Sequence, residues 1–346
     1  MIPSDILEKV GTVNELETGQ TDSVTSNQLL NSQDKYDNIL FEALKSKGDL
    51  QYPLYKHQYD ALYNLALGND VLLIQPCGKG KTRVEVVGPE VVRRGFNFRG
   101  SNLDESQNKC VVLCPLSSII VDKISDDEKS GMIMMTGKTT VGDSEDEGTL
   151  NRPEQDFSDS SIQYIHGHAE SYTTVTGKRI LKVNKDKIVM FTIDEASSPF
   201  MWGIDFRPEL LIVPGILRVH GIKNAPLLAM TATLRQNEIK VLLNKFCMDK
   251  RNHVIIQSSP ILSGSFFGVI LRPSNRTDFY DDNGLKSQLD NLYLKQYIDN
   301  PLESKVAIMF FRSEDKLTEV YLYLENKLSK QFPVNSRRPF VQGIRN

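Results

Sequence analysis

The sequence predicts an α/β protein built on a parallel β-sheet that is covered by helices on both faces. Three observations lead to this fold class. Short apolar runs of strand length alternate with segments of helical periodicity along the chain. The run 188–193 is apolar almost throughout, which is typical of a central strand covered on both faces. A glycine-rich turn directly follows the run 71–74, and two acids directly follow 188–193.

The expected elements follow one another in strand–helix order. Each apolar run is read as a strand, and each segment with apolar residues three or four apart is read as a helix. The expected strands are 71–74, 111–114, 188–193, 227–230 and 306–310. The expected helices start near Lys81, behind Pro115, at 235–246 and behind Ser313, which is a suitable N-cap. This alternation predicts helices on both faces of one sheet.

Composition divides the chain of 346 residues into folded and solvated parts. Residues 1–35 and 142–160 are rich in acids and small polar residues, so we expect a disordered acidic arm and an acidic surface loop. These segments carry charges of −4 and −6 out of a total of −3, which leaves +7 on the rest. A basic body permits a phosphate-binding surface. The expected domains are 36–270 and 301–346, joined by a linker at 271–300.

Some classes of protein are disfavoured by composition. No apolar run approaches the roughly 20 residues of a membrane span, so no membrane partner is expected. The four cysteines are scattered, which is typical of thiols in a reducing intracellular compartment. His166 and His168 lie close together but lack the further ligands that a structural zinc needs, so no zinc is expected.

The strongest local motif is QPCGKGKTR, residues 75–83, directly after the first strand. Gly78 and Gly80 let successive backbone N–H groups turn toward a phosphate, Lys81 supplies a cation for the β- and γ-phosphates, and Thr82 supplies a hydroxyl for Mg²⁺. The general pattern has a glycine where this chain has Gln75. A basic surface turn is the alternative. The other loop residues expected at the ATP site are Pro76, Cys77, Lys79 and Arg83.

The acids Asp194 and Glu195 suit the same site. The carboxyl edge of a parallel sheet holds the nucleotide, and a neighbouring strand must offer a carboxylate to the metal. Asp194 fits the Mg²⁺ role through water, and Glu195 fits the role of orienting the attacking water. The alternative is a pair of acids solvated at a strand end. The loop beyond them carries Phe200, Trp202 and Phe206.

Over about residues 50–325, the sequence resembles the RecQ family of superfamily 2 DNA helicases. YKHQ, which ends at Gln58, resembles the adenine-reading motif, VVLCPLSSIIVDKI resembles motif Ia, and VAIMFFRS at 306–313 weakly resembles motif IV. AMTATLR resembles the coupling motif III, with Thr231, Ala232 and Thr233. DEASSPFMWGIDFRPE resembles motif II joined to an aromatic-rich loop, with matches at Asp194, Glu195, Ala196, Trp202, Gly203, Asp205, Phe206, Arg207, Pro208 and Glu209.

The resemblance implies a fold, cofactors and partners. It implies a RecA-like P-loop domain that uses ATP and Mg²⁺ and unwinds DNA in the 3′ to 5′ direction in repair or recombination, in the nucleus or, in a prokaryote, the cytoplasm. Its partners would be single-stranded DNA and fork-like duplex. Aromatic rings stack on bases without regard to sequence, although core packing is the alternative for Trp202 and Phe206. The residues expected at the ATP site also include Tyr55 and Gln58, and those expected at DNA are Trp202, Phe206, Arg207, Pro115 and Ser117.

Departures from the family pattern qualify these expectations. Ser197 stands where the family's motif II usually ends in histidine, although Ser197 could still bond Thr231 or Thr233. The chain ends at Asn346, before motifs V and VI, which predicts an incomplete second RecA-like domain and no efficient unwinding. Two alternatives stay open: a nucleotide-dependent nucleic-acid-binding module without unwinding activity, and a P-loop enzyme unrelated to nucleic acid, such as a small-molecule kinase.

Overall fold

The computed structural model describes residues 23–115, 132–135, 163–202, 208–222, 224–258 and 314–331, with five isolated residues at 289, 290, 294, 295 and 309. The chain divides into two units, Met1–Ser265 and Phe266–Asn346. The second unit contains helix α15 (Glu314–Gln331), at the place where the sequence predicts a helix behind Ser313. The structure describes only residue 309 of the strand expected at 306–310, so that strand and the second RecA-like domain stay predictions.

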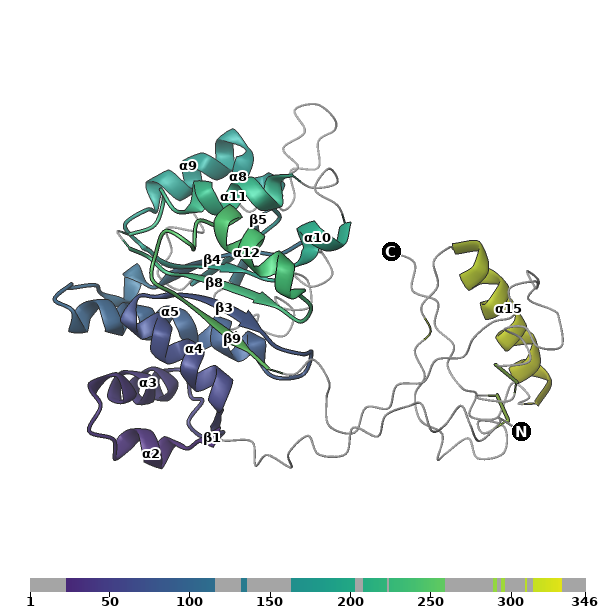
Figure 1. Ribbon diagram of the computed structural model, residues 1–346, viewed down its shortest axis with the longest axis horizontal. Helices are drawn as coiled ribbons and strands as arrows, with labels where there is room; N and C mark the ends of the chain where they lie inside the picture. Colours follow the sequence, from purple (N-terminus) through teal and green to yellow (C-terminus); the bar gives the residue numbers. More distant parts are fainter. Residues whose placement is uncertain are drawn as a thin grey trace, which may run out of the picture. The chain divides into compact units, whose positions relative to one another are not determined.

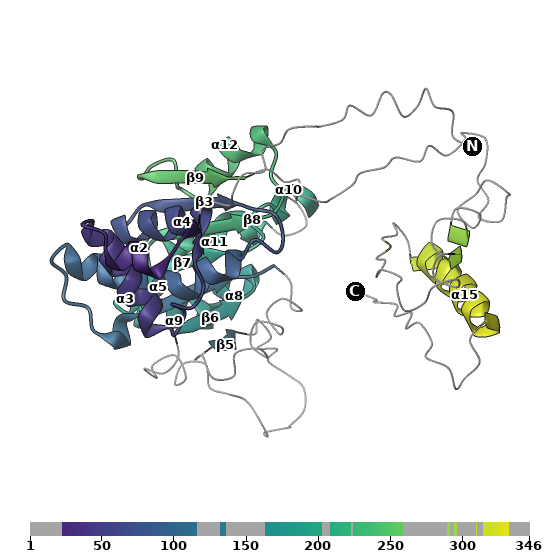
Figure 2. The same cartoon turned by 90° about the horizontal axis from the view of Figure 1, so that it is seen from below.

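The first unit contains a seven-stranded sheet in the order β5-β6-β4-β7-β8-β3-β9. Every pairing within it is parallel. Figure 2 shows β9 and β5 at opposite edges of this sheet. The strands are β3 (Asp70–Ile74), β4 (Lys109–Leu113), β5 (Met132–Met135), β6 (Tyr164–Gly167), β7 (Ile188–Ile193), β8 (Leu227–Thr231) and β9 (His253–Gln257). The α/β prediction is therefore confirmed.

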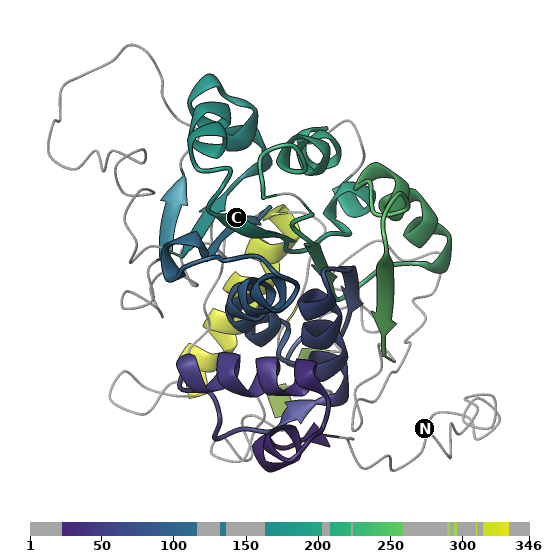
Figure 3. The same ribbon diagram turned by 90° about the vertical axis from the view of Figure 1, so that its left-hand side faces the viewer.

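Helices cover the sheet on both faces (Figures 1 and 3). One face is covered by α3 (Lys35–Ser46), α4 (Lys56–Leu67) and α5 (Lys81–Phe98), which pack on one another. The other face carries α8 (Ala169–Thr173), α9 (Val175–Val183), α11 (Glu209–Leu217) and α12 (Gln236–Lys245). Alternate residues of one strand reach opposite cores: Val71 and Leu73 pack on the first face, and Leu72 and Ile74 on the second.

Regular secondary structure begins closer to the amino terminus than the sequence predicts. The expected disordered arm covers residues 1–35, but β1 (Ser23–Val24) pairs with β2 (Leu54–Tyr55), and α2 (Ser26–Leu30) follows. A capping box in which Thr25 and Gln28 bond each other's backbone starts α2, and Leu29 is buried in the core. Polar composition predicted disorder here because a single buried leucine leaves little trace in it. Residues 1–22 lie outside the described residues.

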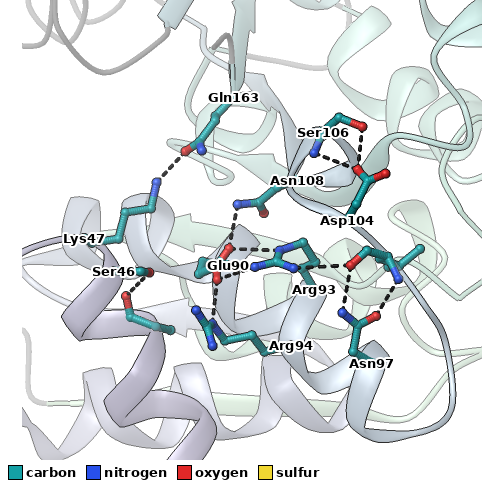
Figure 4. A network of polar contacts seen from close by, with 12 residues as sticks. Ser46, Lys47, Glu90, Arg93, Arg94, Asn97, Asp104, Ser106, Asn108 and Gln163 are labelled. Atoms are coloured by element: carbon teal, nitrogen blue, oxygen red, sulfur yellow. Dashed lines mark hydrogen bonds and ion pairs between the residues drawn. The ribbon is translucent and has the colours of Figure 1, made fainter. Parts of the chain in front are cut away.

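A buried polar network fixes the far half of α5 (Figure 4). The carboxylate of Glu90 accepts hydrogen bonds from Arg93 at 2.6 and 3.1 Å, from Arg94 at 2.5 Å and from the Asn108 amide at 2.8 Å. Asn97 bonds both backbone groups of Leu103. These contacts tie α5 to the connection that contains η1 (Glu105–Gln107) and leads into β4. The helix that leaves the glycine-rich loop is thereby held at its other end.

Candidate functional site

The glycine-rich loop leaves the carboxyl end of β3 and runs into α5. Gly78 and Gly80 have φ angles of 78° and 72°, in the left-handed region that glycine enters without strain. Gly80 is the N-cap of α5, and the first turn of that helix contains no acid. The helix dipole and the N–H groups of the first turn therefore favour an anion at this end. The residues fit a phosphate group.

Lys81 is the first residue of α5, and its ammonium lies over the loop. Its Nζ donates to the carbonyl of Gln75 at 2.9 Å and contacts that of Pro76 at 3.4 Å. Pro76 is buried, Lys79 is half-buried, and Cys77 and Thr82 are exposed. The Lys81 cation and the Thr82 hydroxyl are therefore carried by the same turn of helix that presents the N–H groups.

Gln75, which replaces the usual glycine, joins the loop to its neighbouring strands. The backbone N–H of Gln75 donates to the Thr231 carbonyl at 3.0 Å, and its buried side chain accepts through Oε1 from the Ser258 hydroxyl. The backbone bond to the end of β8 and the side-chain bond next to the end of β9 can position the loop without a glycine at this place. Sequence reasoning treated Gln75 only as a mismatch.

Gln58 is bonded to the loop itself. Its Nε2 donates to the Gly80 carbonyl at 3.0 Å, and its Oε1 accepts from the N–H of Tyr55 at 3.0 Å. The side chain is 2% exposed, and a Cβ on Gly80 would lie 2.4 Å from its Nε2. The sequence predicts that Gln58 reads adenine. In this structure the amide supports the glycine-rich loop, and its contact with adenine stays a prediction.

We expect Gln58→Glu to weaken the binding of ATP and GTP to a similar extent. The substitution replaces an N–H donor with an oxygen facing the Gly80 carbonyl, and an unmade hydrogen bond of this kind costs about 1–3 kcal/mol. Fluorescence titration with the two nucleotides measures the effect. A loss confined to ATP would show instead that Gln58 acts as an adenine reader.

Arg83 ties the start of α5 to the segment before α4. Its guanidinium bonds the Asp49 carboxylate at 2.7 Å and the carbonyls of Pro53 and Tyr52, each at 2.7 Å, and lies 3.4 Å from Gln58 Oε1. The predicted contact of Arg83 with ATP has no support in these bonds, which give the residue a positioning role. These bonds hold the start of α5, directly after the glycine-rich loop, against the segment before α4.

His57 is a second support that sequence reasoning missed. Its Nε2 lies 2.8 Å from the Lys79 carbonyl. Burial lowers the pKa of His57, the Lys79 carbonyl opposes that shift, and the Lys79 charge adds to it. A neutral ring must carry its proton on Nε2 to bond that carbonyl. Tyr55 stacks on the ring at 5.6 Å and is 40% exposed. The available signal was the histidine directly before Gln58 in YKHQ.

Asp194 and Glu195 follow β7 at the same edge of the sheet. The N–H of Asp194 donates to Leu113 at 2.9 Å, and its Oδ1 accepts from the N–H of Glu195 at 3.0 Å. Glu195 has a φ of 47°, a left-handed conformation that costs a non-glycine residue about 1–3 kcal/mol. The Ser198 hydroxyl holds this turn by donating to the Glu195 carbonyl at 2.6 Å. Strain of this kind concentrates at functional sites.

Ser197 joins the acid-bearing loop to the end of β8, as its hydroxyl chemistry predicts. The Thr231 hydroxyl donates to Ser197 Oγ at 2.7 Å, and Ser197 Oγ lies 3.3 Å from Thr233 Oγ1. Thr231 and Ser197 are buried, Thr233 is exposed, and Ala232 is half-buried. Serine therefore maintains the link to motif III that histidine is expected to make in the family.

Ser197→Ala should break this hydroxyl chain and lower the free energy of unfolding by about 1 kcal/mol, the usual value of one neutral hydrogen bond. Chemical denaturation measures the loss. Ser46→Ala is the matched control, since it also removes a hydroxyl that donates to a carbonyl three residues earlier, but on α3 and outside the site. If the Ser197 hydroxyl also couples the loop after β7 to the loop after β8, Ser197→Ala will lower ATP turnover without changing nucleotide affinity. The control variant will change neither.

The expected DNA-contacting residues are placed only in part. Trp202 ends α10 (Ser198–Trp202), but its side chain, like Phe206, Arg207 and Ser117, lies outside the described residues. Pro115 is buried at the end of β4, so a DNA contact through its side chain is not supported. Core packing and base stacking therefore both stay open for Trp202.

The strand order brings the three groups of residues to one edge. β3 ends at the glycine-rich loop, β8 at Thr231 and β7 at Asp194, and β8 lies between the other two. Strands are spaced by 4.7–4.9 Å, so the ends of β3 and β7 are about 10 Å apart. The site combines a phosphate cradle, a cation, a hydroxyl and two carboxylates, a donor set that suits Mg·ATP. Fold and site together define a P-loop domain of the RecA-like kind.

Comparisons with known proteins confirm the resemblance to RecQ-family helicases. The chain is 24% identical over 233 residues to the RecQ-like DNA helicase blm-1 of Caenorhabditis elegans, which covers 66% of this chain and 21% of the relative. It is 24% identical over 193 residues to the probable ATP-dependent DNA helicase RecS of Bacillus subtilis, covering 55% and 34%. It is 23% identical over 272 residues to the ATP-dependent DNA helicase RecQ of Pasteurella multocida, covering 79% and 37%. No family model matches.

Solved structures agree on the fold. The helicase MrfA bound to DNA and AMPPNP is 15% identical, with a TM-score of 0.55 over 90% of this chain and 40% of the other. A second structure of MrfA is 17% identical, with a TM-score of 0.53 over 87% and 42%. The chain spans between about a fifth and two fifths of the length of these relatives and structures.

Proposed function

We propose that this chain binds Mg·ATP and couples its hydrolysis to movement along single-stranded DNA, as an ATP-dependent DNA helicase of RecQ type working in the 3′ to 5′ direction. The supporting observation is the meeting of the glycine-rich loop, the Asp194–Glu195 turn and the Ser197–Thr231–Thr233 hydroxyls at one sheet edge. The similar proteins are DNA helicases by name.

In the proposed reaction, each group has a separate task. The N–H groups of the loop and Lys81 bind the β- and γ-phosphates, and Thr82 and Asp194 hold the metal, Asp194 through water. When bound, Mg²⁺ would neutralise the charge that develops on the phosphates. Glu195 orients the attacking water and accepts its proton. The hydroxyl groups of Ser197, Thr231 and Thr233 link the Asp194–Glu195 turn to the end of β8, where motif III lies.

The test is ATP hydrolysis by the 346-residue chain with and without single-stranded DNA. Stimulation by DNA supports the proposal, whereas hydrolysis that ignores DNA favours a P-loop enzyme unrelated to nucleic acid. A second candidate is a nucleotide-dependent binding module that does not unwind. The loss of the histidine ring from motif II favours it, although the Ser197 hydroxyl keeps a bond to Thr231. ATP-dependent separation of a tailed duplex would exclude that module.

Trp202→Ala should weaken stimulation by DNA while basal ATP binding stays nearly intact, because base stacking contributes about 1–3 kcal/mol per base. A thermal melt recorded beside the hydrolysis assay separates this from a packing role. A core tryptophan would cost about 3–5 kcal/mol of stability and impair every activity together. A stable variant with full stimulation would count against the aromatic loop as a DNA sensor.

A further inference from the structure

The edge of the sheet opposite the nucleotide site holds a cavity of about 640 Å³. The ends of α4 and α5 and the turns before β8 and β9 line it, at the amino end of β3. Three cations, Arg99, Lys250 and Arg251, face one acid, Asp249, and the remaining polar lining is formed by asparagines. The cavity is therefore polar and basic, and its volume lies in the range of small-ligand sites.

Two partly buried arginines share one buried carboxylate behind this cavity. Asp70 is fully buried and bonds both oxygens to Arg218, at 2.9 and 2.5 Å, and one also accepts the N–H of Leu227 at 2.9 Å. Arg251 comes no closer to this carboxylate than 3.4 Å. One carboxylate thus serves two guanidinium groups, and its best geometry is taken by Arg218.

Of the two arginines next to Asp70, Arg251 has the weaker ion pair with that carboxylate. It donates to the Asn224 carbonyl at 3.0 Å, but its Nε has no hydrogen-bond partner in the part of the chain that the structure describes. Burial lowers the pKa of Arg251, Asp70 opposes the shift, and the charge on Arg218 adds to it. An anion in the cavity would compensate this charge, as a buried cation requires.

The other two cations differ in how firmly they are held. Arg99 bonds the Ala66 carbonyl and lies 4.9 Å from the centre of the Phe96 ring, so it is positioned at the cavity wall. Lys250 is exposed and forms no hydrogen bond or ion pair with the described residues. Asp249 already accepts the Asn244 amide at 3.2 Å. The one acid of the lining is thus partly occupied, and Lys250 is available to a ligand.

We infer that this cavity is a second phosphate-binding site, separate from the nucleotide site and built on Arg251, Lys250 and Arg99. β3 separates the two sites by five residues, or about 16 Å. α5 runs from the nucleotide site to this cavity over 18 residues, about 27 Å. The ligand carries a phosphate group, either as a small phosphorylated compound or as the backbone of a nucleic-acid strand.

Calorimetric titration of the full chain with inorganic pyrophosphate tests this inference, in a Lys81→Ala background that weakens the nucleotide site. We expect saturable binding that Lys250→Ala weakens about fivefold and Arg251→Gln about tenfold or more, because charge-assisted bonds are lost and Lys250 is the more exposed. Lys245→Ala, an exposed lysine on α12, is the matched control and should bind normally.

Two further measurements complete the test. A thermal melt checks that Arg251→Gln folds, and the exposed Lys250 keeps the test valid if that variant does not. Displacement of pyrophosphate by a single-stranded oligonucleotide would identify a nucleic-acid backbone as the ligand, and lack of displacement would identify a small phosphorylated compound. Absence of saturable binding, or equal binding by the Lys250→Ala and Lys245→Ala chains, would overturn the inference.

Discussion

Lys81→Ala should lower the affinity for Mg·ATP at least tenfold and reduce hydrolysis by at least as much. The Lys81 ammonium is the cation carried at the N-terminus of α5, where it contacts the carbonyls of Gln75 and Pro76. A charge-assisted hydrogen bond contributes about 1.5–3 kcal/mol, which corresponds to about tenfold or more in affinity. Equilibrium binding of a fluorescent ATP analogue and a phosphate-release assay measure the two effects.

Lys178→Ala provides the control for this experiment. Lys178 is exposed on α9, on the other face of the sheet from α5, so its loss should leave affinity and hydrolysis unchanged. Asp194→Ala should resemble Lys81→Ala only when Mg²⁺ is present, because its task is to hold the metal. Normal binding and hydrolysis by the Lys81→Ala chain would refute the assignment of the glycine-rich loop.

Asp70→Ala should destabilise the first unit by about 3–5 kcal/mol, because it leaves two largely buried guanidinium groups without their carboxylate. Arg218 loses both of its bonds to Asp70, and Arg251 loses its only ion pair among the described residues. The backbone N–H of Leu227 also loses its acceptor at the start of β8. Denaturant unfolding followed by circular dichroism measures the change in free energy.

The exposed pair of Lys56 and Asp60 supplies the matched comparison. Asp60 also pairs with a cation, but on the surface of α4, where an ion pair contributes about 0–1 kcal/mol. Asp60→Ala should therefore shift the unfolding midpoint slightly and Asp70→Ala strongly. Similar shifts for the two variants would contradict the view that the buried Asp70 carboxylate stabilises the fold by pairing with Arg218 and Arg251.

The sequence by itself determined the four strands β3, β4, β7 and β8, the glycine-rich loop and the acids of the site, but not the strands β5, β6 and β9. β7 begins and ends where its apolar run predicts, because a strand buried on both faces must be apolar at successive positions. The glycines at 78 and 80 and the acids at 194 and 195 follow strands directly, so their place at the carboxyl edge follows from parallel pairing. Ser197 was expected to bond Thr231 or Thr233 from its hydroxyl alone, and it contacts both.

The tertiary structure decided which residues support the site and which residues meet at the other edge. Gln58 and Arg83 appear in the sequence as candidates for ATP, and His57 is not singled out. The packing of α4 against the loop gives Gln58 and His57 a supporting role, and the bonds of Arg83 to the segment before α4 give it one as well. Asp70 meets Arg218 and Arg251 because β3 lies between β8 and β9. Local periodicity records whether a residue is buried, but strand order and helix packing join residues more than a hundred positions apart. For that reason the basic cavity at the amino end of β3 can be recognised only from the fold.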